Sequence, residues 1–159
     1  MTLRARPLTA AAFRPFGDVI DATGAPDRII NAGLCGRFHD RARLDFGDGR
    51  AGISLFDAVP RALPLDLDLL ERHPEGSQAF VPMTMSPFLV TVAEGAGPEP
   101  GAIHAFLTRP GQAVNLLRGT WHGVLTPLAA PGLFAVIDRI GAGPNLEEYP
   151  LPEPLRIEA

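Results

Sequence analysis

Three side chains able to bind a metal ion or move a proton stand close together in the segment Glu71–Met83. Glu71, His73 and Gln78 bring a carboxylate, an imidazole and a carboxamide within eight residues, and an apolar run follows at once. Polar groups at the mouth of a buried strand are a common way to build a small-molecule site. Imidazole nitrogen suits zinc, iron, nickel and copper, whereas carboxylate and amide oxygens suit harder ions. The segment therefore predicts a site with mixed nitrogen and oxygen donors.

A second imidazole, that of His122, is the candidate that completes this site. It ends the spacing Gly-x7-Gly-x2-His and directly follows Trp121, for which we predict packing in the core. We expect His73, Gln78 and His122 to contact a divalent metal or a substrate hydroxyl, with Glu71 as a further ligand or as the general base. The alternative is that both histidines are hydrogen-bonded residues of the interior and hold no metal.

A β-rich framework must position these residues. Seventeen glycines and seventeen prolines are spread between short apolar segments, which is the punctuation of a fold with many strands. Thr9–Phe13 predicts one short N-terminal helix, because Thr9 is a good N-cap and the alanines favour helix. Strands are predicted at Asp18–Asp21, Arg28–Gly33, Arg43–Phe46, Ala51–Ala58, Gln78–Met83, Phe88–Ala93, His104–Thr108, Gln112–Leu116 and Leu133–Asp138. Many short strands of this kind are typical of a sandwich, a barrel or a jelly roll. Leu67–Arg72 fits either one helical turn or an extended segment.

Length and composition bound the class of protein. The 159 residues, 46% hydrophobic and 20% charged, fit one domain over residues 1–159, with a core over 16–140. Residues 141–159 predict an extended tail pinned to the surface or to a partner subunit. A net charge of −4 without a long basic run argues against nucleic acid as a partner. No apolar run is long enough to cross a membrane, and no leader is apparent. The single cysteine, Cys35, is expected to pack in the interior of a cytoplasmic protein.

Both spaced patterns resemble the two motifs of the cupin superfamily. Glu71-x-His73-x4-Gln78 is similar to the first motif, with Glu71 and Gln78 in place of its first histidine and its glutamate. The pattern that ends at His122 is similar to the second motif, with Leu117 where a proline is usual. The resemblance implies a mainly β fold of the cupin type, a double-stranded β-helix or jelly-roll barrel. It also implies that the two motifs converge inside the barrel and hold a metal.

A closer resemblance, to bacterial ureidoglycolate lyases, covers nearly the whole chain. It implies cleavage of (S)-ureidoglycolate to glyoxylate and urea in allantoin breakdown, by a cytoplasmic homodimer with a divalent metal, nickel in some descriptions. The alternatives are an amidohydrolase that releases ammonia from the same substrate and a non-catalytic cupin that binds a small carboxylate. The chain departs from the expected pattern at Thr84-Met85 and at Gly123. The matching segments are Phe16–Ile20, Asn31–Gly33, Arg37–Asp40, Glu71–Met83, Val114–Asn115, Trp121–His122 and Ile137–Arg139.

The substrate that the resemblance implies carries a carboxylate and a ureido group. An arginine can bind a carboxylate through two parallel hydrogen bonds, and the candidates are Arg72, Arg139 and Arg37, in that order. Asp138 is expected to pair with Arg139 and to orient it. The alternative for each arginine is a surface ion pair, and for each amide or hydroxyl a turn or strand-end group. The candidate hydrogen-bonding partners of the ureido group are Asn31, Ser77 and Asn115, and Gln78 is a further candidate contact to the substrate.

Overall fold

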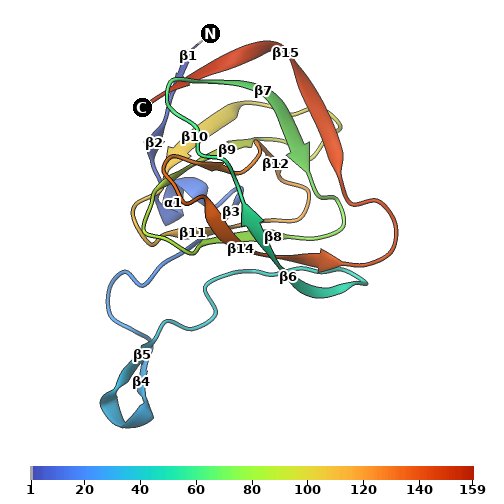
Figure 1. The fold of residues 1–159 in the computed structure, drawn as a ribbon. Coiled ribbons are helices and arrows are strands. Elements are labelled where there is room, and N and C mark those ends of the chain that lie inside the picture. The colour runs from blue at the N-terminus through green and yellow to red at the C-terminus, as the bar shows by residue number, and fades with distance from the viewer. Residues whose placement is uncertain (1) are drawn as a thin grey trace.

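Nearly half of the chain is folded into strands, and most of these strands close into a barrel (Figure 1). The computed structural model describes residues 2–159. The elements before the middle of the chain are β1 (Thr2–Arg4), β2 (Arg6–Pro7), α1 (Ala10–Phe13), β3 (Gly17–Ile20), β4 (Arg28–Ile30), the 3₁₀ turn Asn31–Gly33, β5 (Cys35–Arg37), β6 (Arg50–Asp57) and β7 (Leu65–Arg72). Those that follow are β8 (Gln78–Pro82), β9 (Phe88–Ala93), β10 (Ile103–Leu107), β11 (Ala113–Leu116), β12 (Trp121–His122), β13 (Thr126–Pro127), β14 (Leu133–Ile140) and β15 (Glu147–Glu158). Within residues 2–159, no helix is both long and apolar enough to cross a bilayer.

Two sheets form the wall of the barrel. The larger has the order β1-β15-β7-β12-β9-β10-β2, and β13 also pairs with β9; the smaller has the order β3-β11-β8-β14-β6. Alternate side chains of each strand point inward, and aromatic and aliphatic residues fill the space between the sheets. Phe88 and Phe134, for example, meet edge to face across the interior with centroids 5.0 Å apart. The predicted mainly β fold of the cupin type, with its short helix, is confirmed.

Residues after Gly141 belong to this wall. β15 pairs antiparallel with β7 over most of its length, and β1 adds parallel on its other edge. The side chain of Ile157 is fully buried in a core cluster with Leu67 and Trp121. The extended tail that the prolines predict is therefore a long strand of the larger sheet.

The short helix forms where it was predicted. The hydroxyl of Thr9 accepts a hydrogen bond from the backbone N–H of Ala12 at 3.2 Å, as an N-cap does. Phe13 at the end of the helix is fully buried and packs edge to face on Phe106, with centroids 5.6 Å apart. The helix thus closes one side of the core with an aromatic contact.

Three local predictions were wrong. Residues Arg43–Phe46 form no strand, because their polar groups bond to side chains: the backbone N–H of Arg43 donates to Asp18 and that of Asp45 to Ser77. The predicted strand Arg28–Gly33 ends at Ile30 and turns at once. Cys35 is exposed and not packed in the interior. The open question at Leu67–Arg72 is answered by β7, which is extended throughout.

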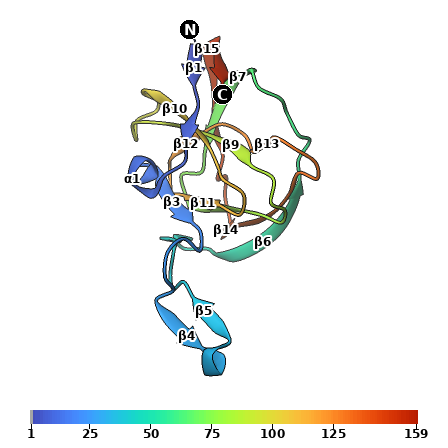
Figure 2. The same cartoon turned by 90° about the vertical axis from the view of Figure 1, so that its left-hand side faces the viewer.

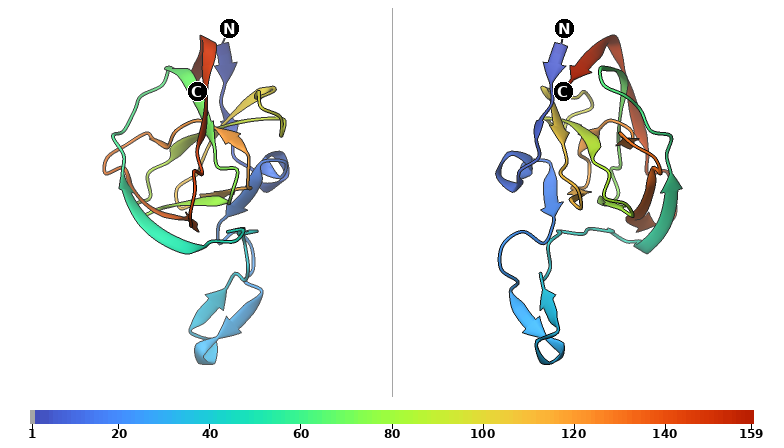
Figure 3. Two further views of the ribbon diagram at one scale, coloured as in Figure 1. Left: turned by 90° about the vertical axis from the view of Figure 1, so that its right-hand side faces the viewer. Right: turned by 60° about the vertical axis from the view of Figure 1, so that its left-hand side comes forward.

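Residues Arg28–Arg37 make an arm that leaves the barrel. β4 and β5 pair only with each other, as a two-stranded sheet separate from the two sheets of the wall. Figures 2 and 3 show the arm reaching away from the barrel on the side of the five-stranded sheet. This hairpin explains why Cys35 is exposed: its strand covers no part of the core.

Candidate active site

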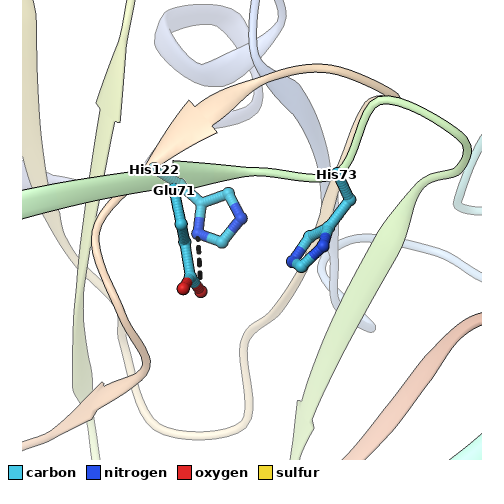
Figure 4. Close-up of side chains that lie close together, drawn as sticks. All are labelled: Glu71, His73 and His122. Carbon is cyan, nitrogen blue, oxygen red and sulfur yellow. Dashed lines mark ion pairs between the residues drawn. The ribbon is translucent and has the colours of Figure 1, made fainter. Parts of the chain in front are cut away.

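Glu71, His73 and His122 meet inside the barrel (Figure 4). Glu71 is on β7 and lies directly opposite His122 on β12. His73 follows β7 and points to the same face as Glu71, because it is two residues further along. One ligand atom from each of the three residues lies within 4.8 Å of the other two. The two motifs therefore converge as the cupin resemblance implied.

Hydrogen bonds to the backbone fix the orientation of both imidazoles. Nδ1 of His73 donates to the carbonyl oxygen of Asn145 at 2.7 Å, and Nδ1 of His122 donates to that of Gly123 at 3.0 Å. A carbonyl only accepts, so each Nδ1 carries the proton and each Nε2 keeps a lone pair. Both Nε2 atoms are buried without a hydrogen-bond partner. Histidine ligands of metals have this arrangement, in which one ring nitrogen is held by an acceptor and the other is free to bind.

Burial shifts the pKa values of His122 and Glu71. Desolvation lowers the pKa of His122 to about 4, so its ring is neutral near pH 7. Desolvation, and after it the negative charge of Glu148, also raises the pKa of the Glu71 carboxyl above its ordinary value. The contact marked in Figure 4, 3.9 Å from Nδ1 of His122 to Glu71, is too long for a hydrogen bond and joins no charged pair at neutral pH.

Gln78 supplies a further side-chain oxygen on the inner face of β8. It stands two residues before Phe80, whose ring meets that of His122 edge to face at 6.4 Å. Its Nε2 donates to the carboxylate of Asp138 at 3.2 Å across the β8–β14 pair. This bond uses the amino end of the amide and leaves Oε1, which is buried and has no partner. Gln78 therefore offers an oxygen acceptor, as a metal ligand or a substrate contact must.

The donor set suits a divalent cation. Nε2 of His73 and Nε2 of His122 are buried without a hydrogen-bond partner, and the carboxylate of Glu71 lies beside the two rings. Oε1 of Gln78, on the inner face of β8, is buried and unpaired as well. An apolar interior normally pairs its polar atoms, so unpaired acceptors of this kind indicate a missing partner. The cavity lined by His122, Phe80, Val90 and Val114 among others has a volume of about 10 Å³. That is room for about one water, so this cavity does not hold a substrate.

Comparison with known proteins agrees with this geometry. A model of the family described as ureidoglycolate lyase matches residues 1–158. A protein named ureidoglycolate lyase from Rhodobacter capsulatus is 66% identical over 157 residues, covering 98% of each chain. The chain belongs to the ureidoglycolate lyase family. Relatives of the same name from Chelativorans sp. (50% identical, 96% of this chain, 94% of the relative) and, as ureidoglycolate lyase 2, from Rhizobium meliloti (50%, 96% and 95%) also match.

Arg72, the first candidate for binding the substrate carboxylate in this member of the ureidoglycolate lyase family, lies away from the histidines. Arg72 alternates with Glu71 and His73 on β7, so its side chain points outward. Its guanidinium lies 4.4 Å from the ring of Trp121, forms an ion pair with Glu147 and donates to the carbonyl of Gly97 at 2.8 Å. The structure does not bring Arg72 to the histidines. Arg72 instead ties the outer face of β7 to β15.

Arg139 is also held away from the group. It points outward from β14, since Asp138 and Val136 point inward. Its guanidinium pairs with Asp48, not with Asp138 as expected from the sequence, while Nε stays buried without a partner. The side chain fits a slot where a Cβ added to Gly49, Gly76 or Gly141 would lie 2.4–2.8 Å from it. Asp138 is free for Gln78 because the strand turns the two neighbours to opposite faces.

Asn31, Ser77 and Asn115, the predicted partners of the ureido group, lie outside the barrel interior. Asn115 is fully buried on the outer face of β11, where its amide donates to Asp18 at 3.0 Å and to the carbonyl of Arg43 at 3.1 Å. Ser77 bonds to the backbone of Asp45. Both hold the segment that crosses the five-stranded sheet. Asn31 and Arg37 lie on the arm, away from the histidines of their own chain (Figure 1).

Three contributors to the site were not predicted as such. Asp138 orients Gln78, the Asn145 carbonyl orients His73, and Phe80 forms the wall beside His122. The side chain of Asn145 also accepts from the backbone N–H of Glu75 at 2.8 Å, which fixes the turn after His73. For Phe80 the sequence favours packing in the core and also allows a place in the wall of the pocket. The alternation of β8 and β14 places Asp138 and Phe80 inward, a signal that the sequence carries once the strands are paired.

Proposed function

We propose that this protein is a ureidoglycolate lyase that cleaves (S)-ureidoglycolate to glyoxylate and urea in the breakdown of allantoin. The observation that carries the proposal is the convergence of Glu71, His73 and His122 in the barrel of a chain from this family. The substrate carbon bears a hydroxyl, a carboxylate and a urea nitrogen. Its cleavage requires that the hydroxyl lose a proton and that the departing nitrogen gain one.

The residues that would hold a divalent metal, which we infer to be nickel from the family resemblance, are His73, His122 and Gln78. Their free atoms are the two Nε2 nitrogens and Oε1. When bound, such an ion supplies a Lewis acid for a hydroxyl and a neighbouring carboxylate oxygen. Because burial keeps His122 neutral near pH 7, its lone pair needs no deprotonation before it binds.

Glu71 is the residue that we assign to proton transfer. Its carboxyl lies beside both imidazoles, and burial raises its pKa toward the range useful for a general base. In the proposed cycle Glu71 takes the proton of the hydroxyl as the C=O bond forms. It returns that proton to the urea nitrogen as the C–N bond breaks. The imidazoles cannot serve as the acid in the tautomers present, because their protons are committed to backbone carbonyls.

Measurement of the products tests the proposal. Purified protein given (S)-ureidoglycolate is expected to release glyoxylate and urea in equal amounts, faster than spontaneous decay. The matched control is Glu71→Gln, which keeps the shape of the side chain and removes the base. Ammonia in place of urea would assign the chain an amidohydrolase activity instead. Binding of the substrate without any change in its decay rate would leave only a non-catalytic binding protein.

Three further parts of the proposal concern the protein as a whole. We take residues 1–159 as a single domain, because β15, β1 and β2 lie in the same sheet as the strands that carry Glu71 and His122. We propose that the chain acts as a homodimer, as the family resemblance implies. We place it in the cytoplasm, since its one cysteine forms no disulfide within the chain.

A further inference from the structure

The arm formed by Arg28–Arg37 has the features of a docking element. An isolated two-stranded hairpin is at best marginally stable in water, and this one packs mainly on itself and on its own turn. Two of its three large apolar side chains face solvent: Leu34 is 88% exposed and Ile29 61%, while Ile30 is half-buried. Exposed aliphatic side chains on a hairpin of defined shape indicate that another surface covers them.

The shape of the arm is specified at both ends. At its tip Asn31, Ala32 and Gly33 all have left-handed backbone angles, and the N–H of Leu34 donates to the carbonyl of Asn31 at 3.1 Å. At its root Asp27 accepts from the backbone N–H of His39 at 2.8 Å and pairs with Arg41 at 2.9 Å. These contacts hold the arm out from the barrel and present Leu34 at its end.

The charge of the arm is also unbalanced. Arg28 and Arg37 are directly opposite each other in the β4–β5 pair, a position in which like charges destabilise a sheet. Within residues 2–159, neither guanidinium forms an ion pair or a hydrogen bond. The hairpin from Arg28 to Arg37 contains no acidic residue, in a chain of net charge −4. The arm therefore suits a surface that offers a carboxylate.

The outer face of the five-stranded sheet provides an apolar surface with such a carboxylate. Ile53 and Leu55 point outward from β6, an edge strand, and are 75% and 65% exposed. They pair with Ile137 and Ala135 on β14, and Val81 on β8 continues the same outward row. Asp57 follows Leu55 on the same face and is exposed. We call these six residues the aliphatic face; the arm leaves the barrel on this side (Figures 2 and 3).

We propose that the aliphatic face is the interface between two copies of this chain, each of which lays its arm over the other's aliphatic face. Leu34 and Ile29 of each arm pack on Ile53 and Leu55 of the partner copy, and the arginine pair meets the acidic edge at Asp57. Because each copy carries one arm and one aliphatic face, a twofold dimer covers both arms and both faces. This inference rests on the proposed homodimer and names its contact surface.

Thiol cross-linking tests the contact, because Cys35 is the only cysteine of the chain and lies exposed on the arm. One preparation keeps Cys35, and a second carries Cys35→Ser with Leu55→Cys. After mixing to exchange subunits, a short bismaleimide is expected to link the two chains into a species of twice 16.9 kDa. The matched control replaces Leu55→Cys by Asp68→Cys, an exposed position on the other sheet, and is expected to give no link. In a single chain that carries Cys35 and Leu55→Cys together, a monomer linked within itself would show the arm folded on its own barrel and overturn the proposal.

Sedimentation measures the energetic side of the same contact. Leu34→Asp and Leu55→Asp are each expected to raise the dimer dissociation constant at least tenfold, while Met85→Asp, which is 68% exposed and outside the aliphatic face, leaves it unchanged. A dimer that none of these variants weakens and that does not cross-link would overturn this interface and leave the homodimer standing. A monomeric wild type would overturn both, and urea release, measured separately, would still decide the lyase activity.

Discussion

Nε2 of Gln78 donates to the carboxylate of Asp138 at 3.2 Å, which fixes the amide so that Oε1 is its free end. Asp138→Asn removes the charge that selects this orientation, because an asparagine can face Gln78 with either end. We expect the affinity for a divalent metal to fall tenfold to a hundredfold, as for other residues that orient ligands. Competition with a chelator measures this, with Asp66→Asn on the exposed face of β7 as the control. Unchanged affinity would mean that Gln78 contacts substrate alone.

Removal of either imidazole should abolish catalysis without unfolding the protein. We expect His73→Gln and His122→Gln each to lower kcat/KM for ureidoglycolate at least a hundredfold. The matched control is His104→Gln on β10, whose ring contacts Glu94 and which is separated from β7 by the strands β12 and β9. Circular dichroism verifies that the variants remain folded. Full activity in the His122 variant would move the site away from the second motif.

Metal removal should reveal both a catalytic and a stabilising effect. Protein purified without added metal is expected to carry close to one divalent ion per chain by elemental analysis. Dialysis against a strong chelator should abolish activity and lower Tm, because a ligand at about 100 times its Kd stabilises the folded state by about 2.7 kcal/mol. Addition of nickel should restore both. Chelator-treated protein that keeps full activity would exclude a catalytic role for the ion.

Acid should weaken the metal-free protein through His122. Its pKa is about 4 when folded, against an ordinary value of 6.5. The folded state therefore binds fewer protons than the unfolded chain between these values. The contribution to stability is complete above about pH 6.5 and is lost as pH falls to about 4, by about 1.4 kcal/mol per pH unit. Glu71, whose pKa is raised, has the opposite sign, because its contribution is lost as pH rises.

Chemical denaturation of metal-free wild type and His122→Gln at several pH values isolates this effect, since Glu71 is present in both. The free energy of unfolding of the wild type should fall more steeply from pH 6.5 to pH 4.5. Parallel curves for the two proteins would show that His122 does not titrate in this range.

Arg72 should matter for stability more than for chemistry. Arg72→Met removes its contact with Trp121, its ion pair with Glu147 and its bonds to the carbonyls near Gly97. We expect a loss of about 1–3 kcal/mol in the free energy of unfolding with kcat/KM within a fewfold of wild type. Thermal unfolding and steady-state kinetics separate the two. A large rise in KM with unchanged Tm would show that Arg72 binds the substrate.

Local patterns predict the fold better than the site. Alternation and turn residues located the strands at Gln78–Pro82 and Phe88–Ala93 to within a residue, because β9 is buried throughout and β8 over its first three residues. The same alternation would have turned Arg72 away from Glu71, had β7 been recognised as extended. Its last residues, Glu71 and Arg72, are charged, so the apolar pattern fades where the site begins.

The features that local patterns do not predict depend on contacts between residues distant in the sequence. Gln78 and Asp138 are 60 positions apart, and only the pairing of β8 with β14 brings them together. Cys35 looked like a core residue because its neighbours are small and apolar. Whether such a hairpin covers the core or leaves it depends on Asp27 and the segment after it, which no short pattern encodes.

The bond from His73 to Asn145 ties the site to the order in which the chain is made. A nascent chain synthesised only as far as Ile140 contains His73, His122, Glu71 and Gln78. It lacks the carbonyl of Asn145, which orients His73, and the strand β15, which pairs with β7. A nascent chain of that length therefore has its catalytic residues but no organised centre. Activity should appear abruptly during synthesis, once the segment from Asn145 to Glu158 has emerged and paired.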